Sequence, residues 1–243
     1  KPLNVFIIGG GGFVMPRHLA AKRPGSQITV AEIDPAVTEA ACRGFDLRVE
    51  WPIEVHDQDG RNVVEDLLRR DQEGYFDFVI GDTINNCAIP YHLTTREFNE
   101  RITRLLKPDG VYLIHIIEVP ESGRFLGTMI NTLAETFPNI TVVSSSMNPV
   151  RKNTFVIAAS LQPRDFAGLE DAIHRQYPTF KGWLLSPEEV ADYRRRADGM
   201  VLTDDYAPVD HLVTELVRRN RQDLIEKYLA RGQVASDAGR FAE

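Results

Sequence analysis

The stretch Asn4-Val-Phe-Ile-Ile-Gly-Gly-Gly-Gly12 decides the fold of this chain. Its apolar run, Val5 to Ile8, carries no charge and consists of β-branched or aromatic residues, which is typical of a strand buried on both faces of a parallel sheet. Glycines follow such a strand where the chain turns sharply and a ligand must approach the backbone with no Cβ in the way. The stretch therefore predicts the first strand-to-helix turn of a nucleoside-binding α/β domain.

An acidic residue follows the next predicted strand. The apolar run Ile28 to Ala31 ends at Glu32, about 20 residues beyond the glycines, where a carboxylate can accept hydrogen bonds from both ribose hydroxyls. Taken alone, the glycines are compatible with a flexible turn and Glu32 with a solvated loop residue. Together, in a strand-helix-strand frame, they favour nucleoside binding.

The glycine spacing argues against a dinucleotide. In a G-x-G-x-x-G fingerprint counted from Gly9, Val14 takes the place of the last glycine, and counted from Gly10, Met15 does. That third glycine permits close packing of the helix on the strand, so its absence disfavours a nicotinamide cofactor. The looser glycine loop of S-adenosylmethionine-dependent enzymes fits better.

Length and composition set the class. With 243 residues, 43% hydrophobic and 26% charged, the chain has room for one large α/β domain. A net charge of -7 and a pI near 5.5 disfavour nucleic acid as a partner and are compatible with a cationic substrate. Cys42 and Cys87 have no metal-ligand spacing and are too few for a disulfide framework, which indicates a reducing cytoplasm. No apolar run approaches the ~18 residues of a membrane span.

Strand-like and helix-like segments alternate to about residue 160. Besides the two runs above, we expect strands at 51–56, 76–80, 111–117, 140–144 and 154–159, and helices at 13–23, from 35, at 61–70, 94–106 and 122–137. This predicts a doubly wound, Rossmann-like methyltransferase fold of about seven strands. Helical patterns at 163–176, 187–196 and 209–230 then predict a catalytic domain over 1–162 and a helical C-terminal extension over 163–243, packed on the same domain.

Glycines and carboxylates fall at the ends of successive predicted strands. Ligands of open α/β sheets bind beyond the carboxyl ends of the strands, and Gly9–Gly12, Glu32, Asp59 and Asp82 all lie there. Asp59-Gly60 is equally compatible with a plain turn and with a contact to an adenine amine. At the end of a central strand, Asp82 favours a catalytic or substrate-contact role over a helix cap.

These motifs resemble those of spermidine synthases and related polyamine aminopropyltransferases over roughly residues 3 to 160. The shared elements are Ile-Gly-Gly-Gly11, Glu-Ile-Asp34, Asp-Gly60 and a strand that ends in Gly-Asp82. Longer motifs are similar to bacterial spermidine-synthase-like domains fused behind membrane-transporter-like segments; they are Ile-Pro-Tyr-His-Leu-Thr-Thr-Arg-Glu-Phe98, Leu-Lys-Pro-Asp-Gly110 and Leu-Thr-Asp-Asp-Tyr-Ala-Pro208. Because Lys1-Pro2-Leu3 leads directly into a central strand, we expect further residues upstream. The resemblance implies that these could include a membrane domain that tethers an otherwise cytoplasmic protein.

The resemblance implies a transferase that moves an aminopropyl group from a sulfonium nucleoside to a small-molecule amine. The co-substrate is S-adenosylmethionine or its decarboxylated form. Donor binding falls to residues of the glycine loop and the strand ends: Gly9, Gly10, Gly11, Gly12, Glu32, Ile33, Asp59, Gly60, Asp82 and Thr83. Within this set Glu32 binds the ribose, Asp59 lies by the adenine, and Asp82 is the catalytic residue that holds the amine and takes its proton.

Amine binding falls to four other residues: Asn85, Tyr91, Asp205 and Tyr206. The two tyrosines could face a cation through their rings, and ordinary packing of a half-buried tyrosine fits equally well. The resemblance also leaves open a homodimer.

Two positions depart from the aminopropyltransferase pattern. Gly12 stands where these enzymes carry an acid that receives the aminopropyl ammonium group, and Asn85 stands where they carry a second acid that binds the acceptor. Both changes weaken recognition of a dication. They also leave room for intact S-adenosylmethionine, whose carboxylate could pair with Arg17. Asp204 and Asp205 either restore negative charge over the pocket or cap the last helix.

The histidines show no metal spacing, and we predict no metal. His92 could be a second proton carrier, whereas His115, inside a strand, is expected to be a hydrogen-bonded core residue. Three functions stay open: the aminopropyltransferase-like enzyme, a methyltransferase that uses the intact donor, and a nucleoside-binding domain without catalysis.

Overall fold

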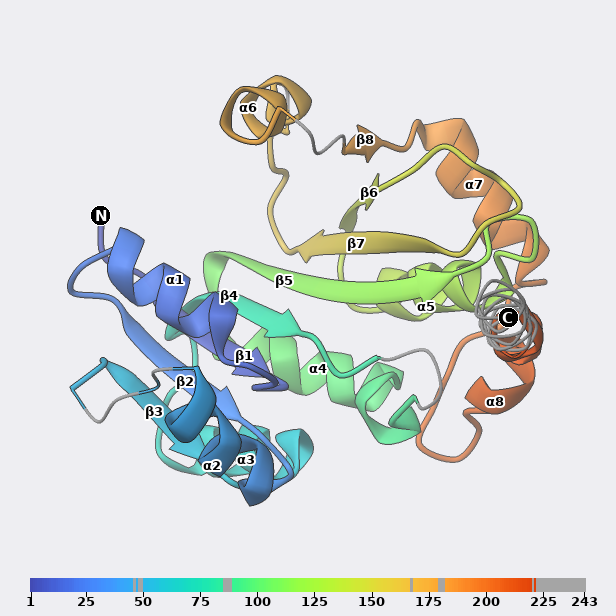
Figure 1. Cartoon of the computed structure of the whole chain (residues 1–243). Helices are drawn as coiled ribbons and strands as arrows, with labels where there is room; N and C mark the ends of the chain where they lie inside the picture. The colour runs from blue at the N-terminus through green and yellow to red at the C-terminus, as the bar shows by residue number, and fades with distance from the viewer. Residues whose placement is uncertain are drawn as a thin grey trace, which may run out of the picture.

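A computed structural model describes residues 1–45, 47, 50–84, 89–166, 168–178, 182–219 and 221. Its centre is an eight-stranded sheet with the order β3-β2-β1-β4-β5-β7-β6-β8 (Figure 1). The strands are β1 (Asn4–Ile8), β2 (Gln27–Ala31), β3 (Ile53–His56), β4 (Phe76–Gly81), β5 (Leu106–Glu118), β6 (Asn139–Ser144), β7 (Asn153–Ser160) and β8 (Trp183–Leu184). The predicted doubly wound α/β sheet is confirmed.

The sheet is parallel on one side and antiparallel on the other. Strands β3, β2, β1, β4 and β5 run parallel, whereas β7 lies antiparallel to both β5 and β6. The strand order reverses at β1, because β2 and β4 pair with its two edges. Ligands of such sheets bind beyond the strand ends at this reversal, next to the glycines that follow β1.

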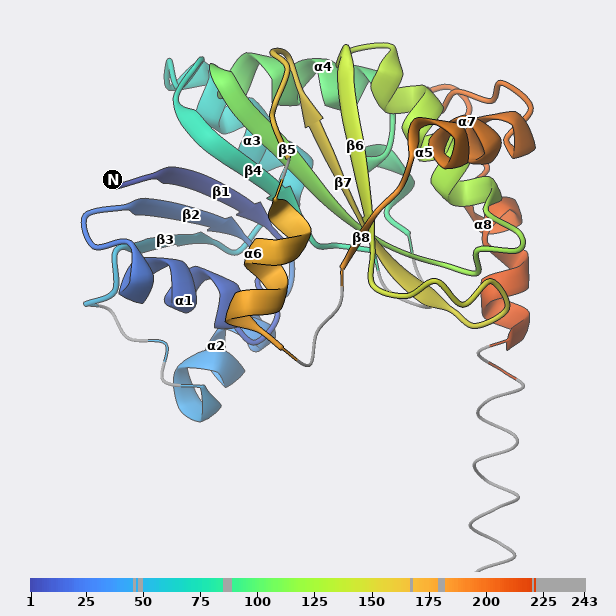
Figure 2. The same cartoon turned by 90° about the horizontal axis from the view of Figure 1, so that it is seen from above.

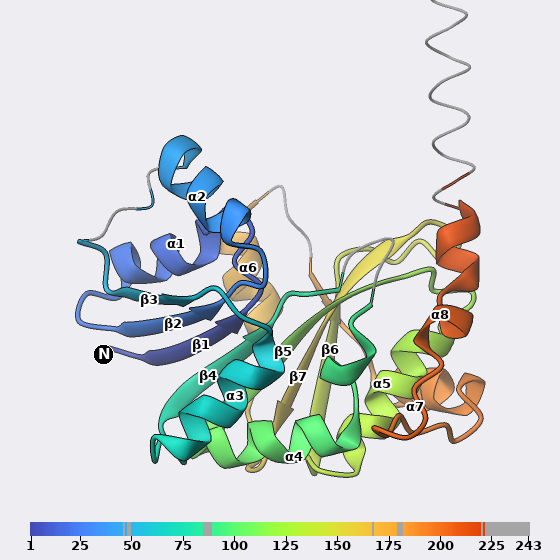
Figure 3. The same ribbon diagram turned by 90° about the horizontal axis from the view of Figure 1, so that it is seen from below.

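Helices cover both faces of the sheet. They are α1 (Val14–Lys22), α2 (Pro35–Gly44), α3 (Gly60–Arg69), α4 (Arg96–Leu105), α5 (Arg124–Ala134), α6 (Leu169–Gln176), α7 (Pro187–Arg196), α8 (Val209–Leu212) and a 3-10 turn, η1 (Tyr91–Leu93). Helices α1 and α2 lie on one face of the sheet, beside β1–β3, and α3, α4 and α5 lie along its opposite face (Figures 2 and 3).

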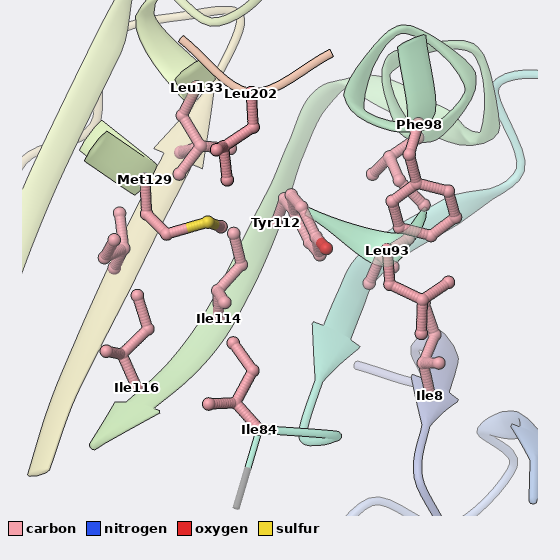
Figure 4. Close-up of a cluster of buried hydrophobic side chains, with 14 of the residues drawn as sticks. Ile8, Ile84, Leu93, Phe98, Tyr112, Ile114, Ile116, Met129, Leu133 and Leu202 are labelled. Carbon is pink, nitrogen blue, oxygen red and sulfur yellow. The ribbon is translucent and has the colours of Figure 1, made fainter. Parts of the chain in front are cut away.

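Two apolar clusters fill these layers, because alternate residues of a strand point to opposite faces. In β1, Phe6 and Ile8 belong to the larger cluster under α3, α4 and α5, whereas Val5 and Ile7 belong to the smaller one, which also holds Ala20 of α1. Figure 4 shows side chains of the larger cluster from β1, β5, α4 and α5 in contact across the sheet. The glycine loop therefore leaves a strand that is buried on both faces.

The observed elements differ from the predicted ones in three places. Strand β5 starts at Leu106 instead of 111, since Lys107-Pro-Asp-Gly110 continues it and Lys107 pairs with Asp77 at 2.8 Å. Strand β8 pairs with β6 and brings the sheet to eight strands, so the region after residue 163 is not entirely helical. The predicted helix over 209–230 is α8 followed by helical residues at 214–219, and its remainder lies outside the described residues.

The region after residue 163 contacts the sheet domain closely. A Cβ on Gly127 of α5 would lie 2.0 Å from the carbonyl oxygen of Tyr193 in α7, so a glycine is required for the two helices to approach this closely. Within the described part of the chain, no helix is long and apolar enough to cross a membrane.

Candidate nucleoside site at the carboxyl edge of the sheet

A cavity of about 460 Å³ lies at the carboxyl ends of β1, β2 and β4. Most of the predicted donor-binding residues line it, together with parts of the 89–93 segment: Ile8, Gly9, Gly11, Ala31, Glu32, Ile33, Asp59, Gly60, Asp82, Thr83, Ile89, Pro90, His92 and Leu93. The fold thus brings together residues that are up to 85 positions apart in the sequence, from Ile8 to Leu93.

Other predicted site residues lie elsewhere. Gly10 and Gly12 belong to the loop beside the cavity without lining it, and Tyr91, Asp205 and Tyr206 are exposed outside its lining. Asn85, with Cys87, lies outside the described residues.

The glycine loop packs against the end of β4. Gly9 has φ +101°, and a Cβ there would lie 2.5 Å from the carbonyl oxygen of Asp82, so only glycine fits. The backbone N–H of Gly9 donates to Ala31 and that of Asp82 donates to Ile8, at 2.8 and 2.9 Å. These contacts fix Asp82 directly beside the loop.

Glu32 organises the same loop. Its Oε2 accepts hydrogen bonds from the backbone N–H groups of Gly10 (2.8 Å) and Gly11 (3.1 Å), and its Oε1 accepts one from Asp34 (3.1 Å). The residue is only 8% exposed, yet it lines the cavity. A carboxylate has about four acceptor positions, so it can hold the loop and still accept from a ligand. This structural role of Glu32 was not predicted, because no local sequence pattern indicates it.

Asp59 joins a helix start to a histidine. Its Oδ1 accepts from the backbone N–H of Arg61 at 2.9 Å and caps α3, while its Oδ2 lies 2.8 Å from Nε2 of His92. Both side chains line the cavity. Asp59 is therefore a turn residue and a cavity residue at once, and the partnership with His92 was not predicted.

Asp82 is the most open carboxylate of the cavity, with a side chain 45% exposed. Its Oδ1 lies 2.9 Å from Nδ1 of His115, which projects from β5. The expectation that His115 is a hydrogen-bonded core residue is wrong, because its side chain is 29% exposed and its Nδ1 makes no well-angled hydrogen bond with any described residue. The strand pattern alone predicts a buried core residue at position 115.

The 203–206 turn is anchored by Asp204. Both Asp204 oxygens accept from the Arg61 guanidinium, at 2.8 and 2.5 Å, and Oδ1 also accepts from Thr95 at 2.7 Å. These hydrogen bonds, Arg61 first, lower the pKa of the Asp204 carboxyl. Asp204 therefore neither caps the last helix nor adds free negative charge to the cavity; it ties the turn to α3 and α4.

The charge of the cavity is acidic. Glu32, Asp59 and Asp82 line it, and its lining, as far as the chain is described, includes no Lys or Arg. Arg17 donates from Nε to the carbonyl of Phe13 at 3.1 Å and is not part of the lining. No group of three or more His, Cys, Asp or Glu side chains that could hold a metal occurs among the described residues.

The sheet order and the glycine loop after β1 define a Rossmann-like protein of the methyltransferase fold. Residues 1–165 match the model of the spermine/spermidine synthase domain, and the chain belongs to this family.

The individual relatives include an aminopropyltransferase and a protein methyltransferase. The chain is 37% identical over 111 residues to the polyamine aminopropyltransferase of Vibrio vulnificus, which covers 46% of the chain and 36% of the relative. It is 25% identical over 122 residues to the eEF1A lysine and N-terminal methyltransferase of Bos taurus, covering 48% and 18%. The chain thus spans less than half the length of these curated relatives.

Solved structures share the fold. A probable spermidine synthase from Corynebacterium glutamicum superposes with a TM-score of 0.72 at 21% identity, covering 85% of this chain and 74% of that one. A spermidine synthase in complex with the transition-state analogue AdoDATO gives 0.59 at 20% identity, covering 82% and 70%. At these identities the likeness concerns the fold alone.

Proposed function

We propose that this chain is a spermidine-synthase-like transferase that moves an aminopropyl group, or a related one, from a sulfonium nucleoside to an amine. The observation that carries the proposal is the acidic cavity beside the glycine loop, where Asp82 is exposed at the end of β4. Sulfonium donors and amines are both cationic, and carboxylates in a partly enclosed cavity attract them. The family membership and the AdoDATO complex of a related fold support the same class of ligand.

The donor is placed by the residues that line the cavity. Glu32 accepts from the ribose hydroxyls, Asp59 with Gly60 faces the adenine, and Gly9 and Gly11 leave backbone exposed to the methionine-derived tail. Ile33 and Thr83 complete the lining on either side.

Asp82 acts on the amine. An unperturbed alkylamine has a pKa near ~10 and is protonated at neutral pH, so it attacks only after it has lost a proton. The Asp82 carboxylate orients the nitrogen and takes the proton. The nitrogen lone pair forms the new N–C bond while the C–S bond breaks with its electrons moving to sulfur, which leaves a neutral thioether nucleoside.

Calorimetry and mass spectrometry test this proposal. We expect the chain to bind methylthioadenosine and to convert putrescine with decarboxylated S-adenosylmethionine into spermidine. Asp82→Asn abolishes turnover while binding persists, and Asp57→Asn, a nearby exposed carboxylate bonded to Thr38, serves as the matched control. If neither donor nor methylthioadenosine binds, the proposal is wrong.

A methyltransferase with the intact donor is the second candidate, and Gly12 favours it. Among the described residues, the atoms nearest to a Cβ on Gly12 belong to Val14 and Phe45, at 3.7 and 3.9 Å, so the closest neighbours of the place where aminopropyltransferases carry an acid are apolar. Product mass separates the two, because a methyl group adds less mass than an aminopropyl group. A third candidate, a binding domain without catalysis, predicts that Asp82→Asn matches the wild type in every assay.

The location of the protein, the segment that precedes this chain and the oligomeric state remain predictions. We propose a cytoplasmic position for this domain, a preceding membrane-transporter-like segment and a homodimer on the resemblance of its longer motifs. Light scattering on the purified chain tests the dimer, since a single monomer mass at micromolar concentration contradicts it.

A further inference from the structure

A buried imidazole nitrogen faces the catalytic candidate. Strands β4 and β5 pair in parallel with Gly81 opposite Ile114, so the next residues, Asp82 and His115, lie side by side. Nδ1 of His115 is 2.9 Å from Oδ1 of Asp82. This nitrogen is buried and has no well-angled hydrogen bond among the described residues, so Asp82 is the polar group that it approaches.

The other groups around His115 are not titratable. On the far side β7 places Val156 opposite it, and β7 has no ionisable side chain along its length, Asn153–Ser160. Within β5, Tyr112 and Glu118 lie three residues away and therefore point to the opposite face of the sheet. Among the described residues, no ion pair or hydrogen bond joins His115 to α1 or α6. From the strands on both sides, Asp82 is the ionisable group that faces this imidazole.

A carboxylate alone is a weak acceptor for an amine proton. An ordinary Asp has a pKa near ~3.9, whereas an ordinary imidazole, near ~6.5, matches neutral pH and holds a proton there far better. Proton transfer is most efficient when the pKa of the accepting group lies near the working pH. An imidazole in contact with Asp82 supplies such an acceptor without touching the substrate.

We infer that His115 is a positioning residue of the transfer reaction, which holds Asp82 toward the amine and takes up the proton that Asp82 receives. The inference rests on the proposed function. Before the N–C bond forms and the C–S bond breaks, the ammonium proton of the amine passes to Asp82 and on to Nδ1 of His115, whose other nitrogen already carries a proton. The imidazolium then stands beside a carboxylate, and the proton leaves to solvent before the next turnover.

The test compares His115→Gln with the wild type, with His174→Gln on the exposed side of α6 as the matched control. We expect kcat for the amine to fall about 100-fold in His115→Gln, at the low end of what a proton-transfer group contributes. The wild-type pH profile of kcat/KM shows an ionisation that is missing in this variant and present in His174→Gln. Methylthioadenosine affinity stays within about two-fold, which shows that the variants are folded.

A second readout does not depend on turnover. In ¹⁵N spectra of the intact chain, the Nδ1 resonance of His115 moves when Asp82 is changed to Asn; it decides the pairing if His115→Gln fails to fold. An unmoved resonance, or a His115→Gln profile and rate within about two-fold of the wild type, overturns the inference. A wild type that binds the nucleoside but converts no amine contradicts the proposed function instead, so the two failures are distinguishable.

Discussion

Glu32 and Glu118 are two buried glutamates at the carboxyl ends of parallel strands, and both accept hydrogen bonds from backbone N–H groups. Glu32, after β2, holds the glycine loop. Glu118, at the end of β5, accepts from Val119 and Phe125 at 2.8 and 3.0 Å and so holds the start of α5. The difference is access: Glu118 is 0% exposed, whereas Glu32 lines the cavity. A buried glutamate that accepts backbone hydrogen bonds can therefore have a structural role alone, or a structural role together with access to a ligand.

Of the substitutions that test this comparison, removal of the charge of Glu32 is expected to have the largest effect, a loss of ligand affinity. In Glu32→Gln the amide nitrogen replaces one acceptor oxygen and repels a backbone N–H instead of accepting from it. Hydrogen bonds to a charged group contribute ~1.5–3 kcal/mol each, so we expect methylthioadenosine to bind about 100-fold more weakly in calorimetry. The control is Glu39→Gln, an exposed glutamate that pairs with Arg43 on α2. An affinity within about three-fold of the wild type would show that Glu32 serves the loop alone.

The pH dependence of stability tests the role of the buried Glu118. Burial raises the pKa of this carboxyl to about 7, against the effect of its backbone hydrogen bonds. Between ~4.3, the ordinary Glu value, and about 7, the folded chain therefore keeps a proton that the unfolded chain has lost. The free energy of unfolding then decreases as pH rises through this window, by on the order of 3–4 kcal/mol, and is level above it.

Urea unfolding at pH 5 and pH 8 measures this decrease. Other groups also titrate between these values, so the decisive quantity is the difference between the wild type and Glu118→Gln. The Glu118→Gln variant loses a hydrogen-bond acceptor at both pH values, but its side chain cannot titrate. Its free energy of unfolding should therefore differ less between pH 5 and pH 8 than that of the wild type. An equal pH dependence in the two proteins would contradict the role of Glu118.

The strand ends of the site could be predicted because each carries a local signal. The run from Val5 to Ile8 before the glycines, and the acids after β2, β3 and β4, need only the rule that parallel strands end at one edge. The fold followed from the same alternation. Strand β8 did not, since two residues, Trp183–Leu184, pair with β6 only after the chain has returned from α6.

The partners of the site acids could not be predicted, because they depend on tertiary neighbours. Nothing in the sequence around Asp82 or His115 indicates that β4 and β5 bring them into contact. From its local sequence Asp204 could either cap the last helix or bring negative charge to the pocket, yet its partner Arg61 is 143 residues away. Sequence identifies which residues reach the edge of the sheet, and the structure identifies which of them pair.

A carboxylate added at Gly12 tests how the chain recognises the methionine-derived tail of the donor. Gly12→Asp restores the acid that aminopropyltransferases carry, and the nearest atoms to a Cβ there, at 3.7 Å or more, leave room for it. We expect decarboxylated S-adenosylmethionine to bind about 10-fold more tightly relative to the intact donor, in keeping with one charge-assisted hydrogen bond of ~1.5 kcal/mol. Competition calorimetry measures the ratio, with Gly12→Asn as the uncharged control. An unchanged ratio would place the tail elsewhere.

Asp204 provides the smallest effect, because its charge is balanced by a side chain and is partly open to water. Its side chain is 40% exposed, so the pair with Arg61 contributes about 0.5–1 kcal/mol after solvent screening. The pair lowers the pKa of Asp204, so its contribution is complete above ~3.9 and is lost as pH falls through the lower folded value. Urea unfolding of Asp204→Asn should therefore show a loss at pH 7 that shrinks as the pH falls below 4, with Asp205→Asn unchanged. A loss that is the same at both pH values would contradict a contribution from the charge, because the amide oxygen of Asn can keep the hydrogen bond from Thr95.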